Sequence, residues 1–203
     1  MKRVSILFII CSFIFSNDKI PNVKFKTLDN KKVTLDSFYN DGPIAINIWN
    51  LACEPCKKEM KYLSDFNTKY KDVGFEVVSI NIDSPRSMSK VKSFVKSMNY
   101  SFTVLSDPRA EFFRKSGGKV MPYLLFVNKD GTIWKRHVGW NPGDEIKLEE
   151  EIIEVSLLNN PELDLLKKEP TEIDSTIKES LLNNPELDLL KKEPTEIDST
   201  IKE

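Results

Sequence analysis

Short continuous runs of apolar residues alternate along this chain with stretches in which apolar side chains recur every three or four positions. The runs lie at residues 44–49, 75–82 and 123–127, which is the pattern of strands buried on both faces. Helical spacing follows the first run after residue 53, and follows the second run over residues 88–98. Buried strands that alternate with amphipathic helices predict a mixed α/β sheet.

Weaker patterns predict the shorter elements of the same sheet. Two short strands around an Asp-Asn turn predict a hairpin near the start, and an Asp-Gly turn predicts a second hairpin after the third apolar run. The remaining expected elements are strands at 23–26, 32–35, 103–105 and 132–137, a short helix at 109–115, and a last amphipathic helix from Pro142 to Val155.

The first sixteen residues have the pattern of a secretory signal. Lys2 and Arg3 precede the mostly apolar residues 4–15, a stretch too short to span a bilayer easily, and a cleavage site is expected after Ser16. Two alternatives are an uncleaved anchor through residues 4–15 and lipidation of Cys11, which the bulky residue before it disfavours. We therefore expect a periplasmic or otherwise extracytoplasmic protein, secreted or tethered to a membrane.

The last 48 residues are a tandem duplication, because residues 156–179 and 180–203 are identical. The two copies together carry a net charge of −6, whereas the residues before them carry +5. Each copy has too few large apolar side chains for a core, and Asn160 and Asn184 are candidate helix caps before a proline. We expect a mobile, partly helical tail; a partner-docking arm and packing onto the body are alternatives.

The length of the chain allows one globular domain, expected at residues 17–155, and its charge bears on the class of partner. The chain has 203 residues, 40% of them hydrophobic, which suffices for a single core but not for a second full domain. A net charge of −1, with no cluster of lysine and arginine interleaved with aromatics, argues against a nucleic-acid partner.

Two cysteines three positions apart form the candidate site. Cys53 and Cys56 follow the apolar run 44–49 and open a helix, and Pro55 suits the first helical turn because its missing N–H would be unpaired there. The unpaired N–H groups of that turn favour a thiolate, which lowers the pKa of a cysteine from about 8.5 into the range of about 3.5 to 7.5. With Cys11 removed in the leader, these two sulfurs cannot form a disulfide scaffold. A redox dithiol is expected instead.

The motifs that surround this pair resemble the TlpA/ResA-like branch of the thioredoxin superfamily, which comprises exported thiol-disulfide oxidoreductases. The resemblance covers about residues 20–155. The matching pieces are the Ile20-Pro21 start, Ile46-Asn47-Ile48-Trp49 leading into Cys53-Glu54-Pro55-Cys56, then Lys58-Glu59, Val120-Met121-Pro122 and Asn128-Lys129-Asp130-Gly131.

The resemblance implies a thioredoxin-like fold with an added N-terminal hairpin and an insertion around residues 84–106. It also implies a cis peptide bond before Pro122, beside the dithiol, that leaves the Met121 backbone free to pair with a substrate strand. Ala52 stands where many relatives have a second tryptophan, and Lys61 where a proline is frequent. These departures bear on substrate choice more than on the chemistry.

Each residue of the motif has an expected role. Cys53 attacks a substrate disulfide, and the more buried Cys56 resolves the mixed disulfide. Glu59, one turn after Cys56, could pass a proton to or from it if burial raises its pKa, although a solvated helix glutamate is the alternative. Glu54 either tunes the local charge or is simply solvated, and Trp49 belongs to the core with a possible second role in substrate contact.

The function that follows is dithiol-disulfide exchange with protein substrates, without a cofactor other than the Cys53–Cys56 disulfide. The family resemblance implies a reductant for proteins such as apocytochrome c, maintained by a membrane electron donor. The alternative is a copper or client-protein carrier, in which Cys53, Cys56 and His137 would form a soft metal site. Copper-delivery relatives of this fold have a CxxxC motif, however, rather than the CxxC motif of this chain. A zinc site would need two more ligands. Peroxide reduction by Cys53 is disfavoured because no peroxidatic Thr-x-x-Cys pattern is present. We therefore expect no metal, and His137 as a satisfied edge or core residue.

Overall fold

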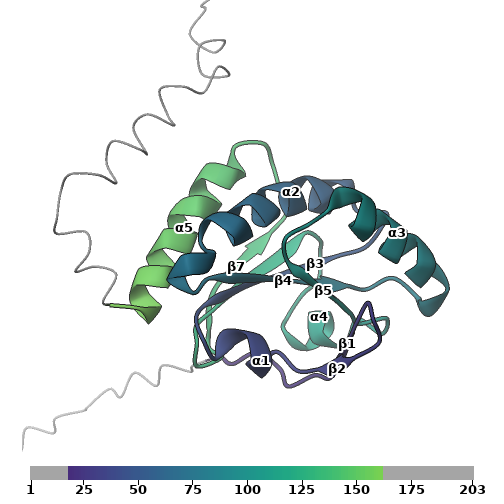
Figure 1. The fold of residues 1–203 in the computed structure, drawn as a ribbon, viewed down its shortest axis with the longest axis horizontal. Coiled ribbons are helices and arrows are strands. Elements are labelled where there is room, and N and C mark those ends of the chain that lie inside the picture. The colour runs from purple at the N-terminus through teal and green to yellow at the C-terminus, as the bar shows by residue number, and fades with distance from the viewer. Residues whose placement is uncertain (1–17, 162–203) are drawn as a thin grey trace, which may run out of the picture. The chain divides into compact units, whose positions relative to one another are not determined.

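Residues 18–161 are the part of the chain that the computed structural model describes, and they form a seven-stranded sheet with helices on both faces (Figure 1). The strands are β1 (Phe25–Thr27), β2 (Lys32–Val33), β3 (Ile44–Trp49), β4 (Glu76–Asn81), β5 (Thr103–Ser106), β6 (Tyr123–Val127) and β7 (Ile133–Val138). The α-helices are α1 (Asp36–Tyr39), α2 (Glu54–Lys69), α3 (Met88–Met98), α4 (Glu111–Lys115) and α5 (Asp144–Asn159), and the 3-10 helices are η1 (Lys71–Val73) and η2 (Pro85–Ser87).

The sheet is mixed, as its sequence pattern predicts. Its order is β2-β1-β5-β4-β3-β6-β7. The three strands β3, β4 and β5 run parallel, whereas β1, β6 and β7 each pair antiparallel with a neighbour. The C-terminal ends of β3, β4 and β5 therefore lie side by side, and the loop with the two cysteines starts from the end of β3.

Alternate side chains of the central strands enter two separate cores. On one face, Trp49 packs with Met60 of α2 and Ile152 of α5, and α3 covers the same side. On the other face, α1 and α4 cover the sheet, and Phe112 lies edge-on to Phe25 with ring centroids 5.7 Å apart. A fully buried side chain of this size contributes about 1.5–3 kcal/mol through the hydrophobic effect. Figure 1 shows α2, α3 and α5 together on one side of the sheet.

The sequence places most elements correctly. Both predicted hairpins are present, and α3 has its predicted ends. The short helix after β5 begins at Glu111 rather than Arg109, because the preceding residues form a turn. In that turn the Ala110 N–H donates to the Asp107 carbonyl at 2.8 Å, and Ala110 has a positive φ of 49°.

The end of the last helix differs from the prediction. Helix α5 runs to Asn159 rather than to Val155, so it extends into the first copy of the repeat. Buried Asn159 explains the extension: its side chain donates to the Asn128 side chain at 2.8 Å and accepts from the Lys129 N–H at 2.9 Å. Asn160 is the C-cap of α5, and the repeat helix predicted to follow it lies outside the described residues.

Two predicted segments lie outside the described residues: the signal or anchor at 1–16 and the repeat tail beyond residue 161. Within residues 18–161, none of the helices has the length and apolar character needed to cross a membrane.

Candidate active site

The dithiol loop is a tight turn from β3 into α2, and Asn50 shapes it. The Asn50 side chain accepts from the Ala52 N–H at 3.0 Å, while its carbonyl accepts from the Cys53 N–H at 3.1 Å. Helix α2 begins directly afterwards, with Cys53 as its N-cap and Pro55 in the first turn. The sequence prediction of a helix that starts inside the motif is therefore confirmed.

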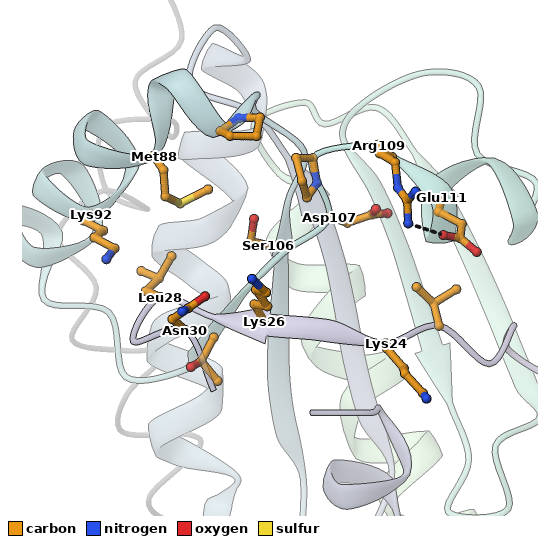
Figure 2. Close-up of a pocket in the computed structure, with 14 residues that line it drawn as sticks. Lys24, Lys26, Leu28, Asn30, Met88, Lys92, Ser106, Asp107, Arg109 and Glu111 are labelled. Atoms are coloured by element: carbon orange, nitrogen blue, oxygen red, sulfur yellow. Dashed lines mark ion pairs between the residues drawn. The ribbon is translucent and has the colours of Figure 1, made fainter. Parts of the chain in front are cut away.

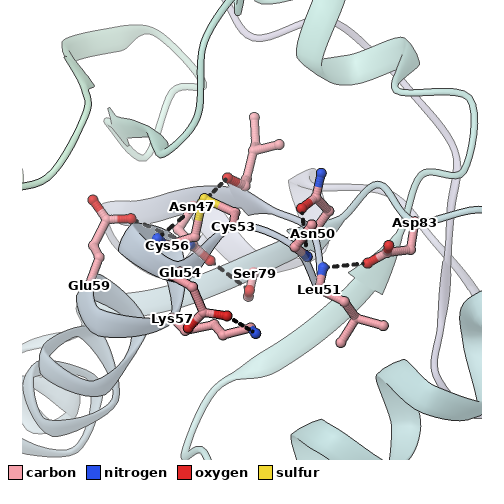
Figure 3. The surroundings of a disulfide bond; sticks show 12 residues. Asn47, Asn50, Leu51, Cys53, Glu54, Cys56, Lys57, Glu59, Ser79 and Asp83 are labelled. Carbon is pink, nitrogen blue, oxygen red and sulfur yellow. Dashed lines mark hydrogen bonds and ion pairs between the residues drawn. A yellow bond between two sulfur atoms is a disulfide. The ribbon is translucent and has the colours of Figure 1, made fainter.

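Cys53 and Cys56 are joined by a disulfide, with their Cα atoms 5.3 Å apart (Figure 3). The Cys53 sulfur accepts from the Cys56 N–H at 3.3 Å, so an unpaired N–H of the first helical turn points at it. Cys53 is half-buried, whereas Cys56 has no exposed surface. An incoming group can therefore reach only the first sulfur, in agreement with the predicted order of burial.

Glu59 is buried on the same helix face as Cys56, with 1% of its surface exposed. Its carboxylate accepts from the Asn47 side chain at 3.4 Å, and Asn47 in turn accepts from the Ser79 hydroxyl at 2.6 Å (Figure 3). Burial raises the pKa of Glu59 to about 8. The hydrogen bond from Asn47 lowers this pKa, and the charge of Asp144 raises it further. The alternative of a solvated glutamate is therefore wrong, and the pKa of Glu59 lies near neutral pH rather than in its ordinary acidic range.

A small cavity borders the Glu59 side chain between α2, β7 and the start of α5. Its volume is about 90 Å³, and Asp144 and Lys147 line it together with Glu59. A polar cavity of that size is large enough for water. The buried carboxyl group therefore has polar surroundings through which a proton can exchange.

Asp83 ties the dithiol loop to the end of β4. Its carboxylate accepts from the Leu51 N–H at 2.8 Å and from the Asn81 side chain at 2.8 Å (Figure 3). The sequence suggests only a turn residue at this position. The contacts make Asp83 the group that fixes the loop before the first cysteine.

Replacing Asp83 with alanine is expected to destabilise the oxidised protein by about 1–3 kcal/mol, because the Leu51 N–H and the buried Asn81 amide lose their acceptor. Chemical denaturation of the disulfide form measures the change. Asp83→Asn keeps a carbonyl oxygen that can accept and should retain most of the stability. An alanine variant as stable as the wild type would show that the loop is held by other contacts.

Three other predicted site residues lie close to the dithiol in sequence. Glu54 is exposed and pairs with Lys57 at 2.7 Å, and Pro55 is also exposed. Trp49 has no exposed surface and packs against Phe94, with ring centroids 5.5 Å apart. This burial assigns Trp49 to the core, while Glu54 and Pro55 lie where a bound substrate can touch them.

The predicted substrate loop has the expected backbone. The Met121–Pro122 peptide bond is cis, and Pro122 is buried. Met121 is half-buried in contact with the apolar clusters on both faces of the sheet. Outside helices and strands, no backbone hydrogen bond of residues 18–161 involves Met121. Val120, just before it, is 59% exposed, so the loop offers an apolar surface.

His137 does not join the cysteines. Its Nε2 atom lies 2.6 Å from the Glu151 carboxylate, which also accepts from Lys135 at 3.0 Å. Burial lowers the pKa of His137, against the raising effect of Glu151. In the described part of the chain, no group of three or more His, Cys, Asp or Glu side chains could hold a metal ion. The ligand set that the copper alternative requires is therefore not assembled.

Sequence reasoning missed the polar network behind the disulfide. Asn47 and Ser79 face each other across β3 and β4, and both have no exposed surface. A signal was present, because each is a polar residue inside a strand that the sequence pattern predicts to be buried. Such residues need a buried hydrogen-bond partner, and here they reach one another and Glu59.

The fold and site together define a thioredoxin-like protein with a CxxC disulfide. A crystal structure from Chlorobium tepidum, described as a candidate thiol:disulfide interchange protein DsbE, has the same fold. It is 28% identical, gives a TM-score of 0.64, and the match covers 69% of this chain and 96% of that one. The predicted thioredoxin-like fold is thereby confirmed.

The chain belongs to the Redoxin family, whose model matches residues 15–152. Among individual relatives, the thiol-disulfide oxidoreductase ResA of Bacillus thuringiensis subsp. konkukian is 33% identical over 113 residues, which are 56% of this chain and 64% of that protein. The alignment thus spans just under two thirds of this relative. A ResA protein of Bacillus cereus is 28% identical over 160 residues, covering 71% of this chain and 91% of the relative.

Proposed function

We propose that this protein is a thiol-disulfide oxidoreductase, which exchanges the Cys53–Cys56 pair with disulfides of protein substrates. The observation that carries the proposal is the asymmetry of the two sulfurs. Cys53 is accessible at the N-terminus of α2, whereas Cys56 is fully buried behind it. Similarity to proteins named thiol-disulfide oxidoreductase ResA supports the same activity.

The exchange follows from this asymmetry. In the reduced protein, the Cys53 thiolate attacks one sulfur of a substrate disulfide and displaces the other as a thiolate. The Cys56 thiol then loses its proton and attacks the Cys53 sulfur, which releases the second substrate thiolate and leaves the protein disulfide. Two electrons pass from the protein to the substrate, so no further cofactor takes part in the proposed reaction.

Glu59 would be the proton carrier for the buried sulfur. The ionised carboxyl group takes the proton from Cys56 when that sulfur attacks, and the neutral form returns it when the disulfide is opened. Support comes from its burial beside the Asn47 amide and from a pKa of about 8, which lets both forms exist near neutral pH.

The finer proposal is an extracytoplasmic reductant of the cytochrome c maturation type, kept reduced by a membrane electron donor. The signal-like residues 1–16 support the location and, if uncleaved, a tether through residues 4–15. The family resemblance supports the direction of electron flow. Equilibrating the pair with glutathione buffers gives its reduction potential and so tests that direction.

The test of the proposed function is a Cys56→Ser variant. Without the resolving sulfur, reaction with substrate proteins should stop at a mixed disulfide through Cys53, visible as higher-mass species on non-reducing gels that dithiothreitol removes. We expect these species in Cys56→Ser and at most traces in the wild type. Stoichiometric copper binding by the wild-type protein, together with no trapped proteins in Cys56→Ser, would instead support a carrier.

A further inference from the structure

A groove of about 550 Å³ lies at the side of the sheet away from β6 and β7, between β1, the start of α3 and the loop after β5 (Figure 2). Its volume is within the range of about 300–1,000 Å³ that is usual for binding pockets. Leu28 and Met88 supply apolar walls, and Lys24, Lys26 and Lys92 surround them. The groove is separate from the dithiol site and has no role in the chemistry described above.

The lysines of this groove carry charge that the protein itself does not neutralise. Lys24, Lys26 and Lys92 are exposed, and none has an ion-pair partner among residues 18–161. Two acids also line the groove, and both have partners within the protein. Asp107 accepts from the Phe112 N–H at 2.8 Å, and Glu111 lies 2.7 Å from Lys115 and 3.7 Å from Arg109. Three lysines and Arg109 against Asp107 and Glu111 leave the lining with a net positive charge around its apolar side chains.

The groove opens at the C-terminal ends of the parallel strands, as the dithiol loop does. Register pairs Trp49 with Asn81, Asn81 with Ser106, and Ser106 with Lys26, which makes one row across four strands. At about 4.8 Å between neighbouring strands, Lys26 lies about 14 Å along this row from the end of β3. A short segment also links the two sites. The Asp83 carboxylate accepts from the Leu51 N–H in the dithiol loop, and Pro85, two residues after Asp83, begins η2 and lines the groove.

We propose that this groove binds an acidic, partly apolar segment of the disulfide-bonded protein substrate while its cysteine reacts at Cys53. The proposal rests on the proposed function and adds a substrate class to it. An extended chain covers about 3.3–3.6 Å per residue, so about four or five residues span the row from the end of β3, where the dithiol loop starts, to Lys26. Negative charge on the segment complements the lysine rim, and one or two apolar side chains fit the interior.

The test uses synthetic peptides that contain one intramolecular disulfide and an arm of Glu-Leu-Glu-Glu placed five residues from the cysteine. A matched peptide carries Gln-Leu-Gln-Gln. Reduced protein should convert each disulfide to two thiols while forming its own disulfide. We expect kcat/KM about five- to tenfold higher for the acidic arm at low salt, because exposed ion pairs are individually weak but several act together. Salt should remove the difference.

Charge-reversed variants assign the effect to the groove. Lys26→Glu/Lys92→Glu should abolish the preference for the acidic arm. The control Lys71→Glu/Lys129→Glu changes the net charge by the same amount at the opposite ends of the strands, where β3 and β4 begin and β6 ends. This control should keep the preference for the acidic arm. Moving the acidic residues next to the cysteine should also remove the gain in rate.

Other outcomes separate the two proposals. Equal rates for both peptides with wild-type protein would overturn the groove assignment and leave the oxidoreductase function intact. Failure to reduce either peptide would overturn the function, and the groove assignment with it. Binding to phosphatidylglycerol vesicles that depends on Lys26 and Lys92, without any arm preference, would assign the rim to a membrane surface and overturn the peptide assignment.

Discussion

Replacing Cys53 with serine is expected to lower the rate of disulfide exchange by at least about 1,000-fold, because a hydroxyl group does not replace a thiolate as nucleophile toward a disulfide. Cys56 cannot take over the attack, since its side chain has no exposed surface. The rate of insulin disulfide reduction, driven by dithiothreitol and corrected for the reaction without protein, measures the loss.

The matched control for this variant is Ala52→Ser, which introduces the same side chain at the adjacent exposed position and keeps both sulfurs. It should retain most of the activity. A Cys53→Ser protein that keeps more than a tenth of the rate would contradict the assignment of the attacking sulfur. Comparison with Cys56→Ser separates the roles further, because only the variant that retains Cys53 should accumulate mixed disulfides.

The sequence predicts the central elements well because their patterns report burial directly. Residues 44–49 are apolar on both sides of the pleat, and in the structure β3 is buried over its whole length between two helical layers. The spacing of apolar residues in 88–98 likewise gives α3 with its observed ends. In both segments, the local pattern and the tertiary environment agree, so no long-range information is needed.

The end of α5 shows where local reasoning fails. Nothing in the sequence near Val155 requires the helix to continue, and the repeat begins at the next residue. The continuation depends on Asn159, whose side chain binds the turn between β6 and β7 about 30 positions earlier in the chain. A contact between segments that are distant in sequence has no signature in either segment alone.

The site was partly predictable for a related reason. Cys53, Cys56 and Glu59 lie within one short motif, so their spacing on a helix indicates a common location. Asn47 and Ser79 meet only because β3 and β4 pair in parallel with one particular register. The lysine-rimmed groove depends in the same way on the row that links β1 to β3, which no single stretch of sequence reveals.

Glu59→Gln is expected to change the pH dependence of stability. The folded protein holds the Glu59 proton up to a pKa of about 8, whereas the unfolded chain releases it near the ordinary value of 4.5. Between these values the folded state binds more protons, so the free energy of unfolding of the wild type falls as pH rises. Each pKa unit corresponds to about 1.4 kcal/mol, and glutamine has no proton to lose.

The stability of Glu59→Gln relative to the wild type should therefore increase by several kcal/mol between pH 4.5 and 8 and then level off. Urea denaturation of the disulfide form across this range measures it. Glu54→Gln, on the exposed side of the same helix, should show no such increase. A constant difference between wild type and Glu59→Gln would mean that the buried carboxyl group is ionised in the folded protein.

Kinetics of the same variant separate a proton carrier from a merely structural residue. Glutamine can hold the Asn47 contact but cannot exchange a proton with Cys56, so resolution of the mixed disulfide should slow by about 100-fold near neutral pH. Attack by Cys53 should be little affected, and mixed disulfides should accumulate during turnover as they do in Cys56→Ser. Equal slowing of attack and resolution would assign Glu59 to packing alone. Selective slowing of the second step, with its pH dependence abolished, requires that the buried carboxyl group carries the proton.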